Sequence, residues 1–213
     1  MKTDELIAML GTNVERVDHR QVTRLLGLTV VVAVAIAVGT TLLMLGIRAD
    51  ALDSASLVFL GLKLGFAAAI VALGAMYLAK VARPGGERMA PVTIVALPFI
   101  AIVLLAAIAL AFAPSSHWNN MVVGDQWLEC LLSIPIIAIV PFAVVIWAVR
   151  RTAPTDLVRA GALAGLVAGG ISAIGYALHC TDDSVPFVAL WYGGTIAICT
   201  LAGAILGPRL LRW

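Results

Sequence analysis

Charged side chains are scarce in this sequence of 213 residues. Asp, Glu, Lys and Arg make up 12% of it, whereas soluble globular domains carry about 25%. Hydrophobic residues make up 62%, and the mean hydropathy is +1.06. This composition excludes an ordinary water-soluble domain. The net charge of +2 also argues against nucleic-acid binding, which needs a concentrated basic patch.

Motifs of the common enzyme classes are missing as well. The sequence has no CxxC, no HExxH, no phosphate-binding glycine loop and no plausible Ser-His-Asp set. Its three cysteines do not follow the spacing of a zinc ribbon or of a small secreted disulfide framework. We therefore expect no enzyme and no permanently bound cofactor.

Long apolar runs dominate what is present. Each is close to the 20 or so residues that a helix needs to cross a bilayer, and none alternates as barrel strands do. The six runs are Leu25–Ile47, Leu57–Ala79, Val92–Ala113, Leu128–Val149, Ala160–Leu178 and Val185–Leu206. The sequence thus predicts an all-α polytopic membrane protein, with a bundle of six transmembrane helices over residues 25–213 and a short cytoplasmic segment over residues 1–24.

The basic residues orient this bundle. Of the 14 Lys and Arg, 12 flank alternate ends of the runs, and the two exceptions are Arg48 and Lys63. The twelve are Lys2, Arg16, Arg20, Arg24, Lys80, Arg83, Arg88, Arg150, Arg151, Arg159, Arg209 and Arg212. Because cytoplasmic loops are enriched in Lys and Arg, both termini should be cytoplasmic. The acidic loops on the other side should face the periplasm or the outside.

Residues 1–24 are predicted to contain an amphipathic helix. Its apolar face is formed by residues at helical spacing, namely Leu6, Ile7, Leu10 and Val14. A helix this short is marginal alone in water, so the face should bind either a groove on a protein or the membrane surface. The acidic start, Asp4 and Glu5, favours the protein, because an anionic leaflet would repel it.

Lys63 is the one charge expected well inside a span. A lysine near mid-membrane costs at least about 2.5–3.5 kcal/mol. It lies only about 9 Å from the outer end at 1.5 Å per residue. We therefore expect it to reach the interface, or to pair with Asp50 or Asp53, rather than to take part in transport.

Two of the cysteines are expected at the same depth. Cys130 begins the fourth run and Cys180 follows the fifth, so both should lie at the outer ends of their helices. With His179 and Glu129 they could bind a soft heavy-metal ion transiently; alternatively they could form a disulfide, or they could be small packing residues. Cys199 is expected to be packing, as are the small-xxx-small glycine patterns.

Several segments together resemble a known family. They are MKTDELI (Met1–Ile7), IPIIAIVPF (Ile134–Phe142) after Cys130, RRTAP (Arg150–Pro154) and GLVAGGISAIGYALHCTDDSVPFVALWY (Gly165–Tyr192). The chain resembles the negative regulator of sigma F (NrsF) family of membrane anti-sigma factors over essentially its whole length. The YALHC, DDS and FVALWY stretches are the most specific part.

The resemblance implies a protein of the bacterial inner membrane that holds an extracytoplasmic-function sigma factor inactive and releases it under heavy-metal or oxidative stress. The N-terminal segment would contact the sigma factor, and Cys130 and Cys180 would be the sensors. Two alternatives are a small metal transporter and a membrane thiol oxidoreductase. The first would need polar residues inside several spans, and the second a quinone pocket beside a reactive thiol pair; neither is evident in the sequence.

Overall fold

The computed structural model describes residues 3, 19–50, 53–83, 92–152 and 154–212, and these residues form helices and no strand. Six helical segments are long and apolar enough to cross a membrane, as the sequence predicted. They are Gln21–Met44, Ser56–Val81, Thr93–Phe112, Ser115–Arg150, Leu157–Ala177 and Val185–Leu210. The predicted face of Leu6, Ile7, Leu10 and Val14 lies outside the described residues and stays a prediction.

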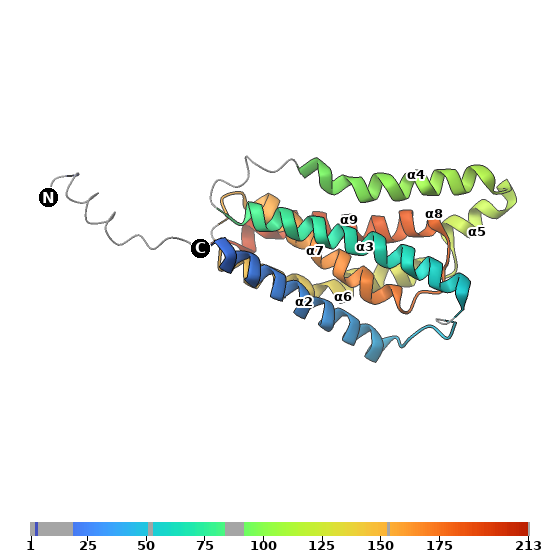
Figure 1. Cartoon of the computed structure of the whole chain (residues 1–213), viewed down its shortest axis with the longest axis horizontal. Coiled ribbons are helices and arrows are strands. Elements are labelled where there is room, and N and C mark those ends of the chain that lie inside the picture. Colours follow the sequence, from blue (N-terminus) through green and yellow to red (C-terminus); the bar gives the residue numbers. More distant parts are fainter. Residues whose placement is uncertain (1–2, 4–18, 51–52, 84–91, 153, 213) are drawn as a thin grey trace.

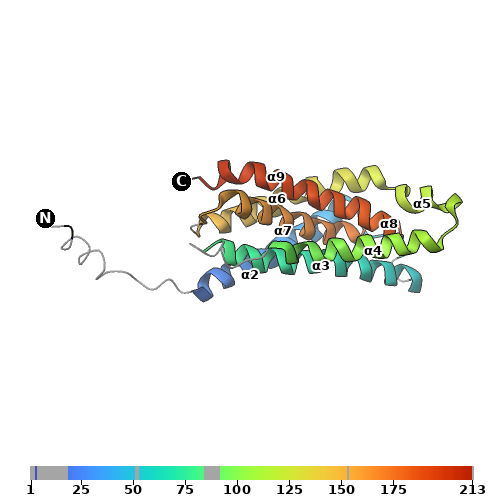
Figure 2. The same cartoon turned by 90° about the horizontal axis from the view of Figure 1, so that it is seen from above.

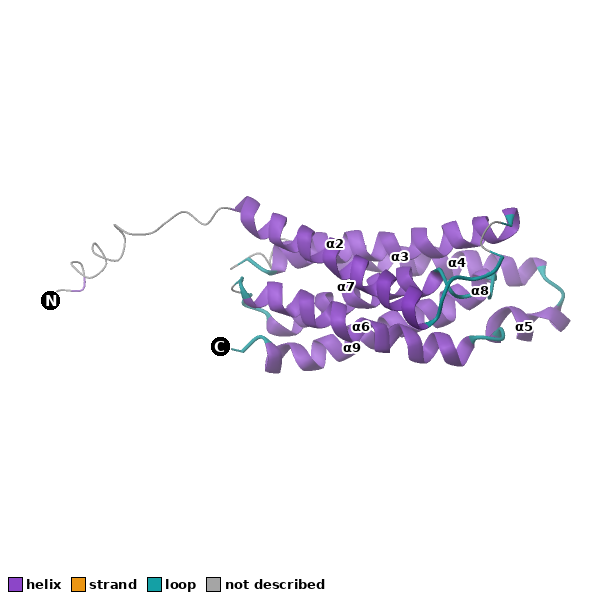
Figure 3. Cartoon of the chain, turned by 90° about the horizontal axis from the view of Figure 1, so that it is seen from below, coloured by secondary structure: helices purple, strands orange, loops and turns teal. Residues whose placement is uncertain are grey.

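The helices run side by side along one axis, with their loops at the two ends of the bundle (Figures 1 and 3). The long helices are α2 (His19–Met44), α3 (Ser54–Val81), α4 (Leu97–Phe112), α6 (Trp127–Arg150), α7 (Leu157–Ala177) and α9 (Gly193–Leu210). The short elements are a 3₁₀ turn (Val92–Ala96), α5 (Trp118–Val123), α8 (Val185–Phe187) and a π turn (Val188–Tyr192). We call the end with α5 and α8 the distal end.

Helix α7 lies at the centre of the bundle. It packs against α2, α3, α6 and α9 (Figure 2), and nearly all of its residues are buried. The surrounding helices instead turn large apolar side chains outward; Leu43 is 87% and Phe112 88% exposed. An exposed apolar surface of this extent is unfavourable in water and is consistent with a membrane protein.

Glycines allow α7 and α9 to approach closely. A Cβ on Gly165 would meet the backbone oxygen of Cys199, and a Cβ on Gly203 would meet that of Gly161. The backbones therefore pack directly against each other, as small-xxx-small patterns permit. The packing interpretation is confirmed for this seam. It stays a prediction for Gly61 and Gly65, because a Cβ at either position meets nothing within 4 Å among the described residues.

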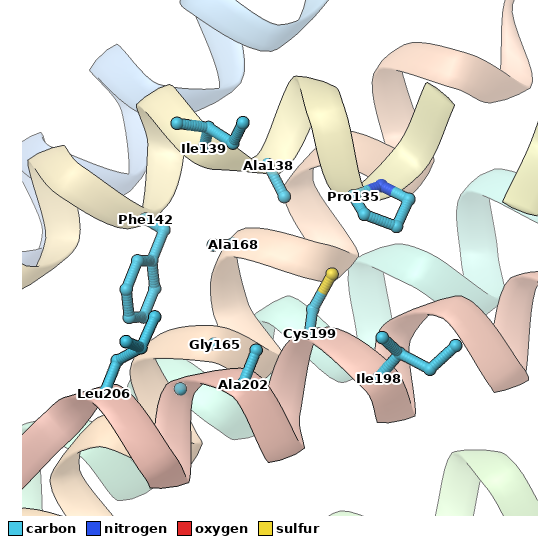
Figure 4. Close-up of a pocket in the computed structure, with 11 residues that line it drawn as sticks. Pro135, Ala138, Ile139, Phe142, Gly165, Ala168, Ile198, Cys199, Ala202 and Leu206 are labelled. Carbon is cyan, nitrogen blue, oxygen red and sulfur yellow. The ribbon is translucent and has the colours of Figure 1, made fainter. Parts of the chain in front are cut away.

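Cys199 faces an apolar pocket of about 160 Å³ between α6, α7 and α9. Figure 4 shows its side chain beside Pro135, with Ala168 on the neighbouring helix. Every other lining residue is apolar or glycine. This environment gives the thiol no partner for chemistry, in keeping with the packing role expected from the sequence.

We predict that Gly165→Ala destabilises the bundle by about 1–3 kcal/mol, because α7 and α9 must separate to admit the methyl group. The matched control is Gly194→Ala on α9, where a Cβ meets nothing within 4 Å. Thermal unfolding in detergent micelles measures both variants. Equal midpoints for the two would contradict a tight glycine seam.

Candidate functional site

At the distal end, a glycine turn directs the chain from α2 onto the end of α7. Gly46 has a φ of +79°, a conformation that costs glycine little. The N–H groups of Leu45 and Gly46 both donate to the Thr41 oxygen, which ends α2. Two residues later, the Arg48 N–H donates to the Leu178 oxygen at 3.1 Å. The loop after α2 is thereby tied to the loop after α7.

The Arg48 side chain is buried in this junction, with 1% of it exposed. Its Nε and Nη2 donate to the two Asp50 oxygens at 2.7 and 2.8 Å. Its Nη1 and Nη2 donate to the Asp183 oxygens at 3.0 and 2.7 Å. Nη1 also donates to the Cys180 backbone oxygen at 3.1 Å. The planar guanidinium suits such simultaneous, forked contacts.

Lys63 of α3 reaches the same two acceptors. Its side chain is fully buried, and its Nζ donates to Asp183 Oδ1 at 2.9 Å and to the Cys180 backbone oxygen at 3.0 Å. From the sequence, Lys63 was expected to reach the interface or to pair with Asp50 or Asp53; it does form an ion pair, but with Asp183. Two cations and two carboxylates balance, as buried charges require.

Hydrogen bonds favour the ionised forms of Asp50, Asp183 and Arg48. The bonds from Arg48 hold the pKa of Asp50 well below its usual range. Burial opposes ionisation of Asp183, but the bonds from Arg48 and Lys63 outweigh it and lower the pKa of that carboxyl. The bonds to Asp50 and Asp183 in turn raise the pKa of Arg48.

Cys130 and Cys180 both lie at the distal end, at a shared depth as expected. Cys130 is in the first turn of α6, and Cys180 follows α7, where its N–H donates to the Tyr176 oxygen at 3.1 Å. Both are free thiols with no exposed surface. Burial raises the pKa of Cys180, although the nearby Lys63 opposes this effect.

Asp182 joins the two cysteine-bearing segments. Its Oδ2 and Oδ1 accept from the N–H groups of Gln126 and Asp125 at 2.7 and 3.2 Å, just before α6. The Gln126 side-chain oxygen accepts from the Thr181 N–H at 3.2 Å in return. The residues flanking Cys180 are therefore bonded to the residues that precede Cys130.

Buried tyrosines surround the thiols. The rings of Tyr176 and Tyr192 lie 6.0 Å apart, and both side chains are fully buried. The Tyr192 hydroxyl lies close enough to the Cys180 thiol to lower its pKa. Within the described part of the chain, however, neither hydroxyl nor His179 Nδ1 has a well-formed hydrogen bond. The environment of the thiols therefore has unused hydrogen-bonding capacity.

The described residues do not form a ready metal site from the ligands that the sequence suggested. Over residues 19–50, 53–83, 92–152 and 154–212, no three His, Cys, Asp or Glu side chains are arranged to hold a metal ion. Glu129 is exposed, unlike the buried thiol of Cys130. Metal binding by Cys130, Cys180, His179 and Glu129 stays a prediction, and it would require these side chains to move.

The sequence placed Asp183 near the cysteines but did not predict its ion pairs with Arg48 and Lys63, and it indicated no role for Arg48, Tyr176 or Tyr192. A usable signal existed for the charges, because Arg48 and Lys63 were the two exceptions to the charge rule and the loop at residues 179–184 is acidic. The tyrosines lie in the YALHC and FVALWY stretches of the family resemblance, but aromatic residues near helix ends are common in membrane proteins, so the sequence indicated no role for them.

We predict that Asp183→Asn costs about 3–5 kcal/mol of stability at neutral pH, because it leaves buried cations without compensation. The control is the exposed Asp125→Asn. Because the folded-state pKa of Asp183 is lowered, its contribution is complete above the unfolded value of about 3.9 and fades as the pH falls below it. Thermal unfolding at pH 7 and pH 3 measures the difference, which should shrink in acid. An unchanged midpoint at pH 7 would contradict the prediction.

Comparison with known proteins bears on the whole chain. The family model described as negative regulator of sigma F matches residues 10–213. A protein of Azospira oryzae named probable anti-sigma-F factor NrsF is 32% identical over 216 residues and covers all of both chains. The anti-sigma-F factor NrsF of Caulobacter vibrioides is 28% identical over 218 residues, again with complete coverage. No solved structure matches. The chain belongs to the negative regulator of sigma F family.

Proposed function

We propose that this chain is an inner-membrane anti-sigma factor that holds a sigma factor through residues 1–24 and releases it when Cys130 and Cys180 react. The observation that carries the proposal is the full-length match to a family whose relatives are named anti-sigma-F factors. That family is regulatory rather than catalytic. We extend the proposal to a sigma factor of the extracytoplasmic-function class, and to heavy metals or oxidants as the stimulus.

The distribution of charge supports the orientation. Among the described residues, the Lys and Arg side chains other than Arg48 and Lys63 belong to residues near the end of the bundle at which α2 begins and α9 ends (Figure 1). By the positive-inside rule that end is cytoplasmic. The thiols and the charge cluster then lie at the periplasmic end, where an external stimulus would arrive.

The N-terminal segment is the natural contact for a cytoplasmic partner. It carries the predicted apolar face, and in the sequence it leads directly into α2, which begins at His19. A segment that orders on binding loses conformational entropy, which lowers its affinity for a given contact area. Such binding is compatible with release after a modest change in the membrane domain.

The thiol chemistry is simple to balance. A cadmium ion would displace one proton from each thiol and form two Cd–S bonds, drawing the sulfurs together. An azo oxidant such as diamide would take two protons and two electrons from the pair, giving one disulfide and a hydrazine. In either case Cys130 and Cys180, both shielded in the resting structure, would become linked across α6 and the end of α7.

A transport function gains no support from the described spans. Lys63 is neutralised at the distal end, and buried hydroxyls satisfy their own helices: Thr41, Ser172 and Thr195 donate to carbonyls one turn earlier at 3.0, 2.9 and 2.7 Å. Such hydroxyls do not form a polar path across the bundle.

We predict that Leu10→Asp abolishes retention of the sigma factor, because an unpaired charge in an apolar interface costs several kcal/mol. Thr12→Asp, on the opposite side by helical spacing, is the matched control and should retain the partner. Co-purification of the sigma factor with detergent-solubilised protein from native membranes measures both. Full retention by Leu10→Asp would show that this segment is a membrane lead-in.

We predict that the double variant Cys130→Ser and Cys180→Ser holds the sigma factor but no longer releases it with cadmium or diamide. The wild-type response should be about 5- to 150-fold in affinity, the usual range for coupled sites. Cys199→Ser, in its apolar pocket, should respond as the wild type does. Stimulus-dependent release by the double variant would return both cysteines to a packing role.

A further inference from the structure

We propose that Arg48, Lys63, Asp50 and Asp183, together with the Cys180 backbone oxygen, form a latch that transmits the state of Cys180 to α2. This inference rests on the proposed function, because it describes how a reaction at the thiols would reach the cytoplasmic segment. The five groups are called the latch below.

Arg48 and Lys63 share a backbone acceptor on Cys180. The backbone oxygen that receives both Arg48 Nη1 and Lys63 Nζ, at 3.1 and 3.0 Å, belongs to Cys180 itself. The sulfur that would react and the oxygen that is held are therefore on one residue. A displacement of Cys180 toward Cys130 on α6 moves that oxygen away from both cations.

Loss of the Cys180 backbone oxygen would be unfavourable for both cations. Arg48 and Lys63 are buried, with 1% and 0% of their side chains exposed. A buried donor without its acceptor is unfavourable, and more so when it is charged. The cations must then follow Cys180 or leave their positions. Because Asp183 accepts from both of them, Arg48 and Lys63 are disturbed together.

The latch is connected to α2 through Arg48. Arg48 lies just after α2, and its own N–H donates to the Leu178 oxygen. The last turns of α2 also pack tightly on α7, where a Cβ on Gly175 would lie 2.9 Å from Thr41 Oγ1 and 3.0 Å from the Ala37 oxygen. A change at the latch therefore alters the seat of α2 on α7.

Helix α2 is continuous between the latch and the N-terminal segment. It runs from His19 to Met44, over 26 residues. A displacement of its distal end is therefore transmitted to its first turn along a single hydrogen-bonded helix. The loop between α6 and α7 lies at the opposite end of the bundle from the thiols (Figure 1), and its Arg159–Asp156 ion pair is local and partly exposed. The latch thus links the thiols to the one helix that continues the N-terminal segment.

The direction of the switch follows from the structure. Both thiols are free and the latch is closed, so the closed latch corresponds to the state that holds the sigma factor. Opening the latch should release it.

The first test is epistasis in the full-length chain in native membranes. Arg48→Lys keeps a cation near Asp183 but cannot span Asp50, Asp183 and the Cys180 oxygen together. We expect it to lower retention about 5- to 150-fold without any stimulus. The same loss is expected when Arg48→Lys is added to the Cys130→Ser and Cys180→Ser variant, because the latch acts after the thiols. Arg159→Lys is the matched control and should retain the sigma factor.

The latch proposal would be overturned if the triple variant, with Arg48→Lys added to the two serines, retained the sigma factor as well as the double serine variant does. It would also be overturned if Arg159→Lys released the sigma factor and Arg48→Lys did not. Failure of the proposed function is a different result: the wild type holds no sigma factor, or the double serine variant still releases it on exposure. In that case both proposals fall.

The second test uses the wild type, so it does not depend on the folding of a variant. Hydrogen–deuterium exchange of the complex with the sigma factor is followed by mass spectrometry before and after cadmium. Exchange in residues 45–50 should rise as the Arg48 N–H leaves Leu178, while the α7–α9 glycine seam should stay protected. The double serine protein should show no rise. Release of the sigma factor without a rise in residues 45–50 would overturn the proposal.

Discussion

Charge neutralisation inside an apolar bundle is the constraint on which the distal end depends. Lys63 and Arg48 are buried within the protein, so water cannot stabilise their charges. Asp183 accepts from both cations and brings with it the loop that carries Cys180. The positions of α2, α3 and the end of α7 are thus set by one electrostatic requirement. The glycine seam fixes α7 against α9 by a different means, the direct contact of backbones.

The large features could be read from the sequence because they depend on local patterns. Six apolar runs gave six helices, since hydropathy and length suffice to identify a span. Cys130 and Cys180 were expected at one depth because alternate spans run in opposite directions, and the structure has them there. The seam of Gly161, Gly165 and Gly203 followed from spacing on two helices.

The contacts between distant residues could not be read in the same way. Lys63 pairs with Asp183, 120 residues later, rather than with Asp50, because the loop after α7 brings the Asp183 carboxylate within reach of both Lys63 and Arg48. Gly61 and Gly65 have the same spacing as the seam glycines, but a Cβ at either position meets nothing within 4 Å in the part of the chain that the structure describes. Spacing indicates where close approach is allowed, and only the fold decides where it occurs.

The long separation between Lys63 and Asp183 also has a consequence for biogenesis. The chain is made from its N-terminus, so α3 is synthesised before the carboxylate that neutralises its lysine exists. A chain that stops anywhere between these residues leaves Lys63 without the carboxylate that neutralises it in the complete protein. Truncated products of this kind therefore carry an uncompensated cation on an apolar helix, and the completion of the chain removes it.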